Sequence, residues 1–104
     1  MTEEILHHRE KVLVRRMILE PGDFTHWHRD LCHRVSTILR GTTLEIEFRD
    51  GSPPHRVEVA AGKVDWDMPS DRIHRAVNVG AEPYEEVTVF FLDHPETVPQ
   101  PQAG

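Results

Sequence analysis

Apolar and polar residues alternate along most of the chain, over residues 12–92. Successive side chains of a β-strand point to opposite faces of the sheet, so this two-residue period predicts half-buried strands. The clearest example is TLEIEFR, residues 43–49, in which Leu44, Ile46 and Phe48 would share one face. The pattern indicates that strands, rather than helices, make up most of the fold.

The same alternation recurs in later segments, separated by turn-forming residues. The segments are HRVEV (55–59), KVDWDM (63–68), HRAVNVG (74–80) and EEVTVFFL (85–92). The turn signals are Pro21-Gly22, Gly41, Asp50-Gly51, Ala61-Gly62, Pro69 and Gly80. Short strands at this spacing are typical of antiparallel sandwiches and barrels. We therefore predict an all-β fold, a single antiparallel β-barrel or jelly roll.

The two ends of the chain are less regular. EEILHHREKVLVRRMIL, residues 3–19, has enough Glu, Leu and Arg to suggest a helix, but Val12 and Val14 favour a strand in at least its second half. The segment HPETVPQPQAG, residues 94–104, is rich in proline and poor in apolar residues. We assign residues 1–95 to the barrel domain and residues 96–104 to an extended or disordered tail.

Length and charge narrow the range of functions. A chain of 104 residues is long enough for one domain with a single core. Its formal net charge of -6 argues against nucleic-acid binding, which needs a basic face. No apolar run approaches the roughly 20 residues that span a bilayer, and MTEEILHHRE does not resemble a secretory signal. We expect a cytoplasmic protein that does not contact membranes.

The stretch THWHRDLCHR, residues 25–34, concentrates groups that bind metals. It contains His26, His28, His33 and Asp30, together with Cys32, the single cysteine of the chain. Imidazole, carboxylate and thiol groups are the usual protein ligands of divalent transition metals. One cysteine cannot form an intramolecular disulfide, and a lone thiol is more often a small buried residue than a ligand.

The stretch also belongs to a motif that resembles the first motif of the cupin superfamily. That motif is Gly, five residues, His-x-His, three or four residues, Glu, six residues, Gly. Here Gly22 is followed at the same spacing by His28, Asp30, Arg34 and Gly41. Asp30 therefore stands where the second His is expected, and Arg34 stands where the Glu is expected.

A second motif of the same superfamily follows further along the chain. Its pattern is Gly, five residues, Pro-x-Gly, two residues, His, three residues, Asn. Gly62, Pro69, His74 and Asn78 match it, with Asp71 in place of a glycine and a first gap one residue longer. The resemblance is to small single-domain bacterial cupins of the conserved-barrel type, and it implies a double-stranded β-helix from Met17 to about Leu92, nearly the whole barrel.

The resemblance implies that the barrel holds a divalent metal, with His28 and His74 as two of its ligands. Two sets could complete the site. Asp30 would give a site of two histidines and one carboxylate, whereas His26 and His33 would give a nitrogen-only site, which we favour slightly because Arg34 is an alternative partner for Asp30. The metal itself is left open among zinc, nickel, iron, manganese and copper.

Three functions are compatible with this pattern. The first is a metal-dependent enzyme of oxygenase, isomerase or lyase type that acts on a small organic acid; Arg34 would bind the carboxylate, and Trp66 and Met68 would line the pocket. The second is a non-catalytic accessory protein that binds or senses a metal or small acid. The third is a metal-free structural barrel, with His28 and His74 as hydrogen-bonding core residues. A homodimer that pairs through edge strands is expected in each case.

Overall fold

The structure is a computed structural model, and it describes residues 1–92. This part of the chain forms nine strands: β1 (Thr2–Arg9), β2 (Val12–Leu19), β3 (His28–Asp30), β4 (His33–Arg40), β5 (Thr43–Phe48), β6 (His55–Glu58), β7 (Val64–Asp67), β8 (Ser70–Asn78) and β9 (Tyr84–Phe91). All pairings are antiparallel. A five-stranded sheet has the order β1-β2-β9-β4-β7, and a four-stranded sheet has the order β3-β8-β5-β6. The prediction of an all-β fold is confirmed.

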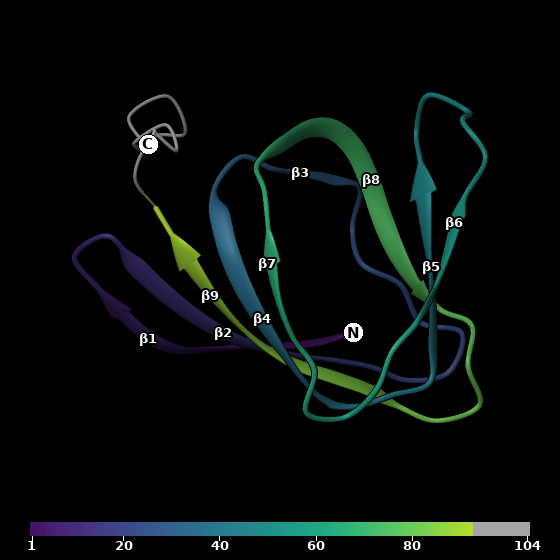
Figure 1. Ribbon diagram of the computed structural model, residues 1–104, viewed down its shortest axis with the longest axis horizontal. Coiled ribbons are helices and arrows are strands. Elements are labelled where there is room, and N and C mark those ends of the chain that lie inside the picture. The colour runs from purple at the N-terminus through teal and green to yellow at the C-terminus, as the bar shows by residue number, and fades with distance from the viewer. Residues whose placement is uncertain (93–104) are drawn as a thin grey trace.

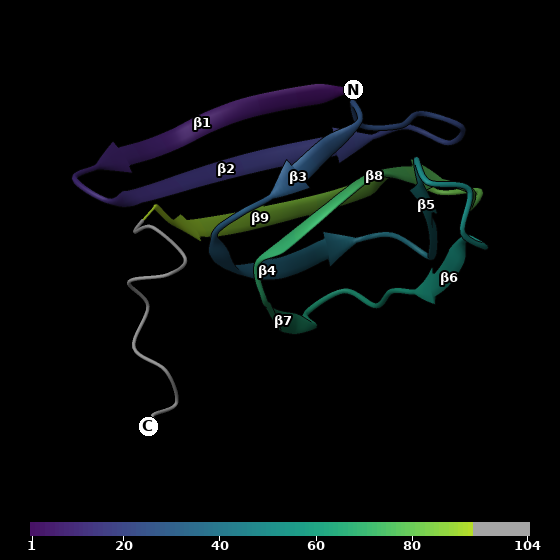
Figure 2. The same ribbon diagram turned by 90° about the horizontal axis from the view of Figure 1, so that it is seen from above.

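The two sheets face each other around a common interior (Figures 1 and 2). In Figure 1 they lie close together at one end and spread apart towards the other end, where β3 and the start of β8 lie. Within residues 1–92 there is no helix that could cross a membrane. The proposed tail of residues 96–104 and the boundary at residue 95 lie outside the described residues.

The N-terminal segment is a β-hairpin along its whole length, so the helical alternative is excluded. β1 pairs with β2 from Thr2↔Ile18 to Arg9↔Val12, and Glu10 adopts a positive φ of 52° in the connecting turn. β2 in turn pairs with β9 over eight residues. The charged residues that suggested a helix form cross-strand ion pairs instead, for example between Arg15 and Glu3 at 3.0 Å.

The closed end of the barrel contains the hydrophobic core. Its buried residues are Met17, Leu19, Ile38, Leu44 and Tyr84, with Val59 and Ala76 packed against them. Gly41 lies beside this core with φ of +145°, and a Cβ there would come within 2.8 Å of the Tyr84 ring. The glycine that ends the first motif is therefore required by close packing.

Asn78, the last residue of the second motif, connects several segments by hydrogen bonds at the closed end, where the two sheets lie close together. Its side chain is fully buried and donates to the carbonyl oxygens of Leu19 and Glu82 at 2.9 and 2.8 Å, while its Oδ1 accepts from the Gly80 amide. Its backbone carbonyl accepts from the amide of Gly22, the first residue of motif one. The two motifs therefore meet through a structural asparagine at the end of the barrel that contains the core.

Candidate metal centre

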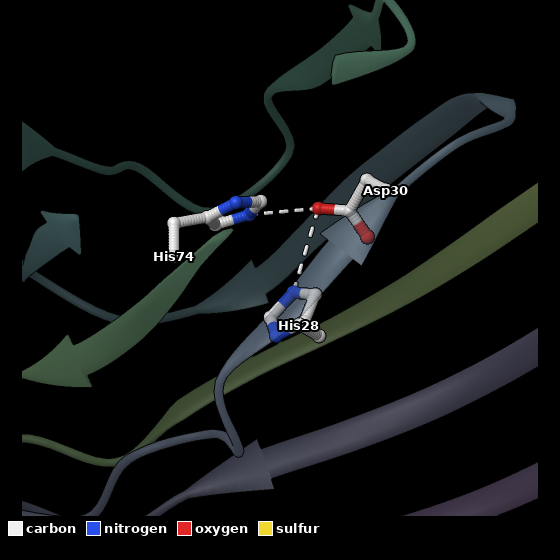
Figure 3. Close-up of side chains that lie close together, drawn as sticks. All are labelled: His28, Asp30 and His74. Carbon is white, nitrogen blue, oxygen red and sulfur yellow. Dashed lines mark ion pairs between the residues drawn. The ribbon is translucent and has the colours of Figure 1, made fainter. Parts of the chain in front are cut away.

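Three of the candidate ligands come together at the open end of the barrel. His28 and Asp30 lie on β3, and His74 lies opposite on β8, with His28 and His74 as direct cross-strand partners. One ligand atom from each of the three lies within 4.8 Å of the others. Figure 3 shows both imidazole rings directed towards one oxygen of the Asp30 carboxylate.

The geometry of the cluster suits a single shared cation. Nε2 of His74 lies 2.8 Å from Asp30 Oδ2, Nε2 of His28 lies 3.4 Å from the same oxygen, and the two ring centroids are 4.5 Å apart. Ligand atoms that bind one metal at about 2.0–2.2 Å are separated from each other by about 3 Å, so these distances are in the right range. His28, Asp30 and His74 are here called the triad.

Backbone carbonyls orient both histidines. Nδ1 of His28 lies 2.6 Å from the carbonyl oxygen of His26, and Nδ1 of His74 lies 2.9 Å from that of Arg72. Because a carbonyl oxygen can only accept, each Nδ1 must donate, and in the neutral ring Nε2 then carries a lone pair. Two lone pairs and a carboxylate oxygen repel one another unless a proton or a metal ion lies between them. The triad is therefore stabilised either by a proton on one histidine or by a metal ion held among the three groups.

The electrostatics of the triad keep its carboxylate ionised. Burial is the largest influence on the pKa of Asp30 and acts to raise it, but the hydrogen bonds from His28 and His74 and the charge of Arg34 together hold that pKa far below its ordinary value. The hydrogen bond with Asp30 raises the pKa of His28, although burial opposes this. A metal ion held by these groups would take the place of the proton that the raised pKa of His28 favours.

Arg34 lies at the edge of the triad, at the position where the cupin motif has its glutamate. Its Nη2 is 3.3 Å from Asp30 Oδ2, its Nε is 3.9 Å from Asp67 Oδ2, and Nη1 donates to the Met68 carbonyl at 3.5 Å. The guanidinium is mostly buried and faces the cavity. Arginine cannot coordinate a metal, so the triad offers three protein ligands instead of four.

The other two predicted nitrogen ligands lie outside the triad. The side chain of His26 is exposed, and the residue contributes its carbonyl oxygen to His28. His33 lies on the outer side of β4, where its Nδ1 accepts a hydrogen bond from Trp66 Nε1 at 3.0 Å. Of the two ligand sets, the structure thus brings together the mixed oxygen and nitrogen set.

Trp66 and Met68, predicted to line the pocket, also point away from it. Their exposed fractions are 59% and 63%, and Trp66 stacks on Phe91 on the outer side of the five-stranded sheet. Register explains this arrangement: Asp67 pairs with Arg34 and faces the interior with it, so Trp66 must face outward. The alternation in this segment is as predicted, but its two faces are exchanged.

The triad opens into a cavity of about 530 Å³ inside the barrel. Its two walls differ. The four-stranded sheet contributes His28, Asp30 and His74 near the opening and aliphatic residues below them: Leu44, Ile46, Val57, Val59 and Ala76. The five-stranded sheet contributes mostly polar residues: Glu3, Arg15, Arg34, Ser36, Asp65, Asp67, Tyr84 and Glu86. A ligand in this cavity would meet hydrogen-bonding groups on one side and aliphatic groups on the other.

The polar wall contains residues that the sequence did not single out. Glu86 accepts hydrogen bonds from Tyr84 at 2.5 Å, Thr88 at 2.6 Å and Arg15 at 3.0 Å. Nε of Arg15 is buried and, within residues 1–92, is the one buried side-chain nitrogen or oxygen without a hydrogen-bond partner. The alternation in EEVTVFFL places Glu86 and Thr88 on the same face of the strand. From the sequence alone, the apolar face of each strand is taken as the inner one, which assigns these two polar residues to the outside.

Comparison with known proteins supports the fold. No family model matches the sequence, and no curated protein matches it significantly. A cupin domain from Bordetella pertussis Tohama I superposes with a TM-score of 0.75 at 20% identity, over 86% of this chain and 90% of that chain. An RmlC-like cupin family protein from Methanocaldococcus jannaschii, described as a double-stranded β-helix, gives a TM-score of 0.70 at 20% identity, over 92% and 83% of the two chains.

The polyketide cyclase RemF from Streptomyces resistomycificus has a TM-score of 0.65 at 14% identity, covering 89% of this chain and 66% of that chain. At such identities the similarity establishes the fold. The protein has the cupin fold, a double-stranded β-helix, with a His/Asp cluster that could hold a metal ion. The resemblance seen in the two sequence motifs is confirmed at this level.

Proposed function

We propose that this protein is a metal-dependent cupin enzyme that binds a small organic acid in its barrel. One observation carries the proposal: two histidines, each with Nδ1 held by a backbone carbonyl, direct Nε2 towards the same carboxylate oxygen. Hydrogen bonds from the second ring nitrogen are the usual way in which proteins orient metal-binding histidines.

His28, Asp30 and His74 would hold the ion. Two histidines and a carboxylate are typical of non-haem iron sites and also suit manganese, nickel, copper or zinc. The bound ion would supply Lewis-acid chemistry, polarising an oxygen of the ligand. Three protein ligands leave coordination positions for that oxygen, which favours a catalytic over a purely structural ion.

Arg34 supports the assignment of an acidic ligand. Its guanidinium faces the cavity beside the triad, where it could bind a carboxylate in addition to its contacts with Asp30 and Asp67. The aliphatic wall would then contact the body of the acid. The fold is shared with a protein described as a polyketide cyclase, which is compatible with catalysis in this barrel.

Metal analysis of the purified protein tests the proposal. We expect about one transition-metal ion per chain after loading, lost in His74→Ala and retained in the control His8→Ala, because His8 is exposed on β1, away from the triad. Metal-loaded protein should also bind short carboxylic acids by calorimetry, and Arg34→Gln should weaken that binding. Equal metal content in the wild type and His74→Ala would refute the assignment of the site.

A metal-free structural barrel is the second candidate. It is favoured by the contacts of Asp30, which already has His28, His74 and Arg34 as partners, so that a proton on one histidine satisfies the triad. In that case loading would leave the metal content near zero. Metal and acid binding without turnover of any acid tested would instead favour an accessory protein that binds or senses its ligand.

We also propose that the protein forms a homodimer through the edge of the five-stranded sheet. β1 is an edge strand, all eight of its residues are exposed, and Ile5 is 54% exposed. Unpaired strand edges with apolar side chains favour pairing with another chain. Sedimentation should give twice the chain mass for the wild type and the chain mass for Ile5→Lys. The cytoplasmic location expected from the sequence stays a prediction.

A further inference from the structure

Asp67 faces the same cavity as the triad but belongs to the opposite sheet. It lies at the end of β7 as the cross-strand partner of Arg34, and both side chains line the cavity. Arg34 spans the gap between Asp67 and the triad, with Nε 3.9 Å from Asp67 Oδ2 and Nη2 3.3 Å from Asp30 Oδ2. A ligand held at the triad by Arg34 therefore lies beside the Asp67 carboxyl group.

Three other acidic groups of the cavity, Asp30, Glu86 and Glu3, have close partners that Asp67 lacks, and Asp65 differs from Asp67 because it pairs with Lys63 at 3.8 Å instead of with Arg34. Glu86 accepts three hydrogen bonds, and Asp30 is shared by two histidines and Arg34. Within residues 1–92, the Asp67 carboxylate accepts no hydrogen bond, and its single ion pair is the long one with Arg34. Its oxygens remain free to exchange a proton with a ligand.

The charged groups that face Asp67 come from several strands. Burial, the largest influence, raises the pKa of Asp67; Arg34 on β4 opposes this, and the negative charges of Asp65, Glu86 and Asp30 raise the pKa further. A carboxyl group with a raised pKa is a stronger base when ionised and is more readily reprotonated near neutral pH, which is the requirement for a group that both takes and returns a proton.

We propose that Asp67 is the catalytic acid and base of this site and that its substrates are 2-oxo acids with a hydrogen on the carbon next to the oxo group. This inference rests on the proposed function, because the triad and Arg34 must hold the acid. The carboxylate of Asp67 takes a proton from that carbon, and the electron pair of the broken C–H bond moves into the oxo group to form an enolate. The protonated Asp67 then returns the proton to oxygen or carbon, so the balanced result is an isomerisation without an oxidant.

The ligand class follows from the groups on each side of the cavity. The carboxylate of such an acid suits Arg34, and the adjacent oxo group suits a cation in the triad, which would make the neighbouring C–H bond more acidic. Because Arg34 is the cross-strand partner of Asp67, the carbon that bears this hydrogen would lie near Asp67, and the remaining chain of the acid would contact the aliphatic wall of Ile46 and Val57.

Deuterium exchange tests the proposal with pyruvate and 2-oxobutyrate as probes. The zinc-loaded protein in D2O should incorporate deuterium at the carbon next to the oxo group, measured by mass spectrometry against the same concentration of zinc alone. Asp67→Asn should lower the protein-dependent rate at least ~100-fold, in the range found for loss of a general base. The matched control Asp71→Asn changes an exposed aspartate and should stay within about twofold of the wild type.

A second readout needs neither metal nor turnover. In the metal-free protein, the 13C signal of the Asp67 carboxyl group should titrate above the ordinary range of aspartate, and Arg34→Gln should raise its pKa further. An ordinary pKa in both proteins would overturn the assignment of Asp67, as would exchange that persists in Asp67→Asn.

The failures of the two proposals differ. If the loaded wild type binds pyruvate but catalyses no exchange, the role of Asp67 is overturned while the proposed metal and acid site stands. If no metal binds, both proposals are overturned together. If Asp67→Asn loses metal or pyruvate binding along with exchange, Asp67 is part of the binding site and is not the catalytic base.

Discussion

The two sheets of the barrel distribute their polar residues in opposite ways. The four-stranded sheet turns aliphatic residues such as Leu44 and Ile46 inward and places Glu47 outside, where it pairs with Arg75 at 2.8 Å. The five-stranded sheet turns Arg15 and Glu86 inward instead. Beside the cavity, the four-stranded sheet thus presents aliphatic residues below the triad and the five-stranded sheet presents mostly polar residues, although both sheets contribute to the buried core at the closed end.

The outer face of the five-stranded sheet shows where its apolar residues lie. Val14 pairs with Val89, Val89 pairs with Val35, and Val35 pairs with Trp66, which gives a continuous apolar row across four strands. Cross-strand pairs of this kind stabilise a sheet without a second layer. A strand can therefore keep perfect alternation while its apolar face is not the one that faces the barrel interior.

The largest expected effect concerns the metal and the four-stranded sheet. Asp30→Ala should weaken metal binding at least ~100-fold, because a directly coordinating group contributes more than the surrounding groups, whose loss costs about 10- to 100-fold. His26→Ala should change affinity less than about threefold, because its contribution to the triad is a backbone carbonyl. Competition titration with a coloured chelator measures both affinities, and the reverse order would restore the nitrogen-only site.

Removal of the metal ion should lower the melting temperature of the loaded protein. An ion at 100 times its Kd stabilises the folded chain by about 2.7 kcal/mol, which corresponds to about 10 °C in the melting temperature of a domain of this size. Calorimetry before and after treatment with a strong chelator measures the shift. A chelator that leaves the melting temperature of loaded protein unchanged would place the ion outside the folded site.

The two sheets should differ when an acidic residue is replaced. Glu86→Leu removes an inward carboxylate with three hydrogen-bond donors and should cost about 2 kcal/mol of unfolding free energy, since those donors lose their partner. Glu47→Leu removes a single, partly buried ion pair on the outer face and should cost about 1 kcal/mol or less. Urea denaturation measures both values, and equal costs would contradict the contrast between the sheets.

A smaller effect is expected from pH on the outer side of the five-stranded sheet. Hydrogen bonds from Arg16 and Arg40, with Arg16 the stronger influence, hold the pKa of Glu85 below its ordinary value. A lowered pKa stabilises the folded state above the unfolded pKa of about 4.5, and this stabilisation is lost as pH falls through the folded value. The stability difference between wild type and Glu85→Gln should therefore shrink from pH 7 to pH 3 in urea titrations.

The smallest effect is expected at Trp66. Because its side chain is largely exposed on the outer face, Trp66→Ala should lower stability by about 1 kcal/mol or less and leave metal and acid binding unchanged. A loss of acid binding, measured by calorimetry, would instead indicate that Trp66 lines the cavity, as predicted from the sequence.

Most of the fold could be predicted from the sequence, because apolar and polar residues alternate within its strands and turn-forming residues separate them. Alternation and turns identified the strands from β5 onwards, and the motif resemblance brought His28 and His74 to one site, where the structure shows them as cross-strand partners. The N-terminal hairpin was ambiguous, since Glu and Arg residues that favour helices are also suited to cross-strand ion pairs, as between Arg16 and Glu4.

The candidate site was predicted less fully, for a physical reason. Which face of a strand looks inward depends on register with its neighbours, and one residue of slip exchanges the faces. The inward positions of Asp67 and Glu86 follow from pairing with Arg34 and Met17, contacts between strands far apart in the chain. Whether Asp30 or His26 joins His28 and His74 likewise depends on how β3 pairs with β8, where the register shifts between His28 and Asp30.

The orientation of the two triad histidines has a consequence for how this site can change over evolutionary time. The groups that fix both rings are main-chain carbonyls of residues 26 and 72, which every amino acid possesses. Side chains at these positions are free to vary without disturbing ring orientation, provided that the local backbone path is kept. Related proteins could therefore share the same preorganised site while their sequences, aligned letter by letter, show agreement at only three positions around it.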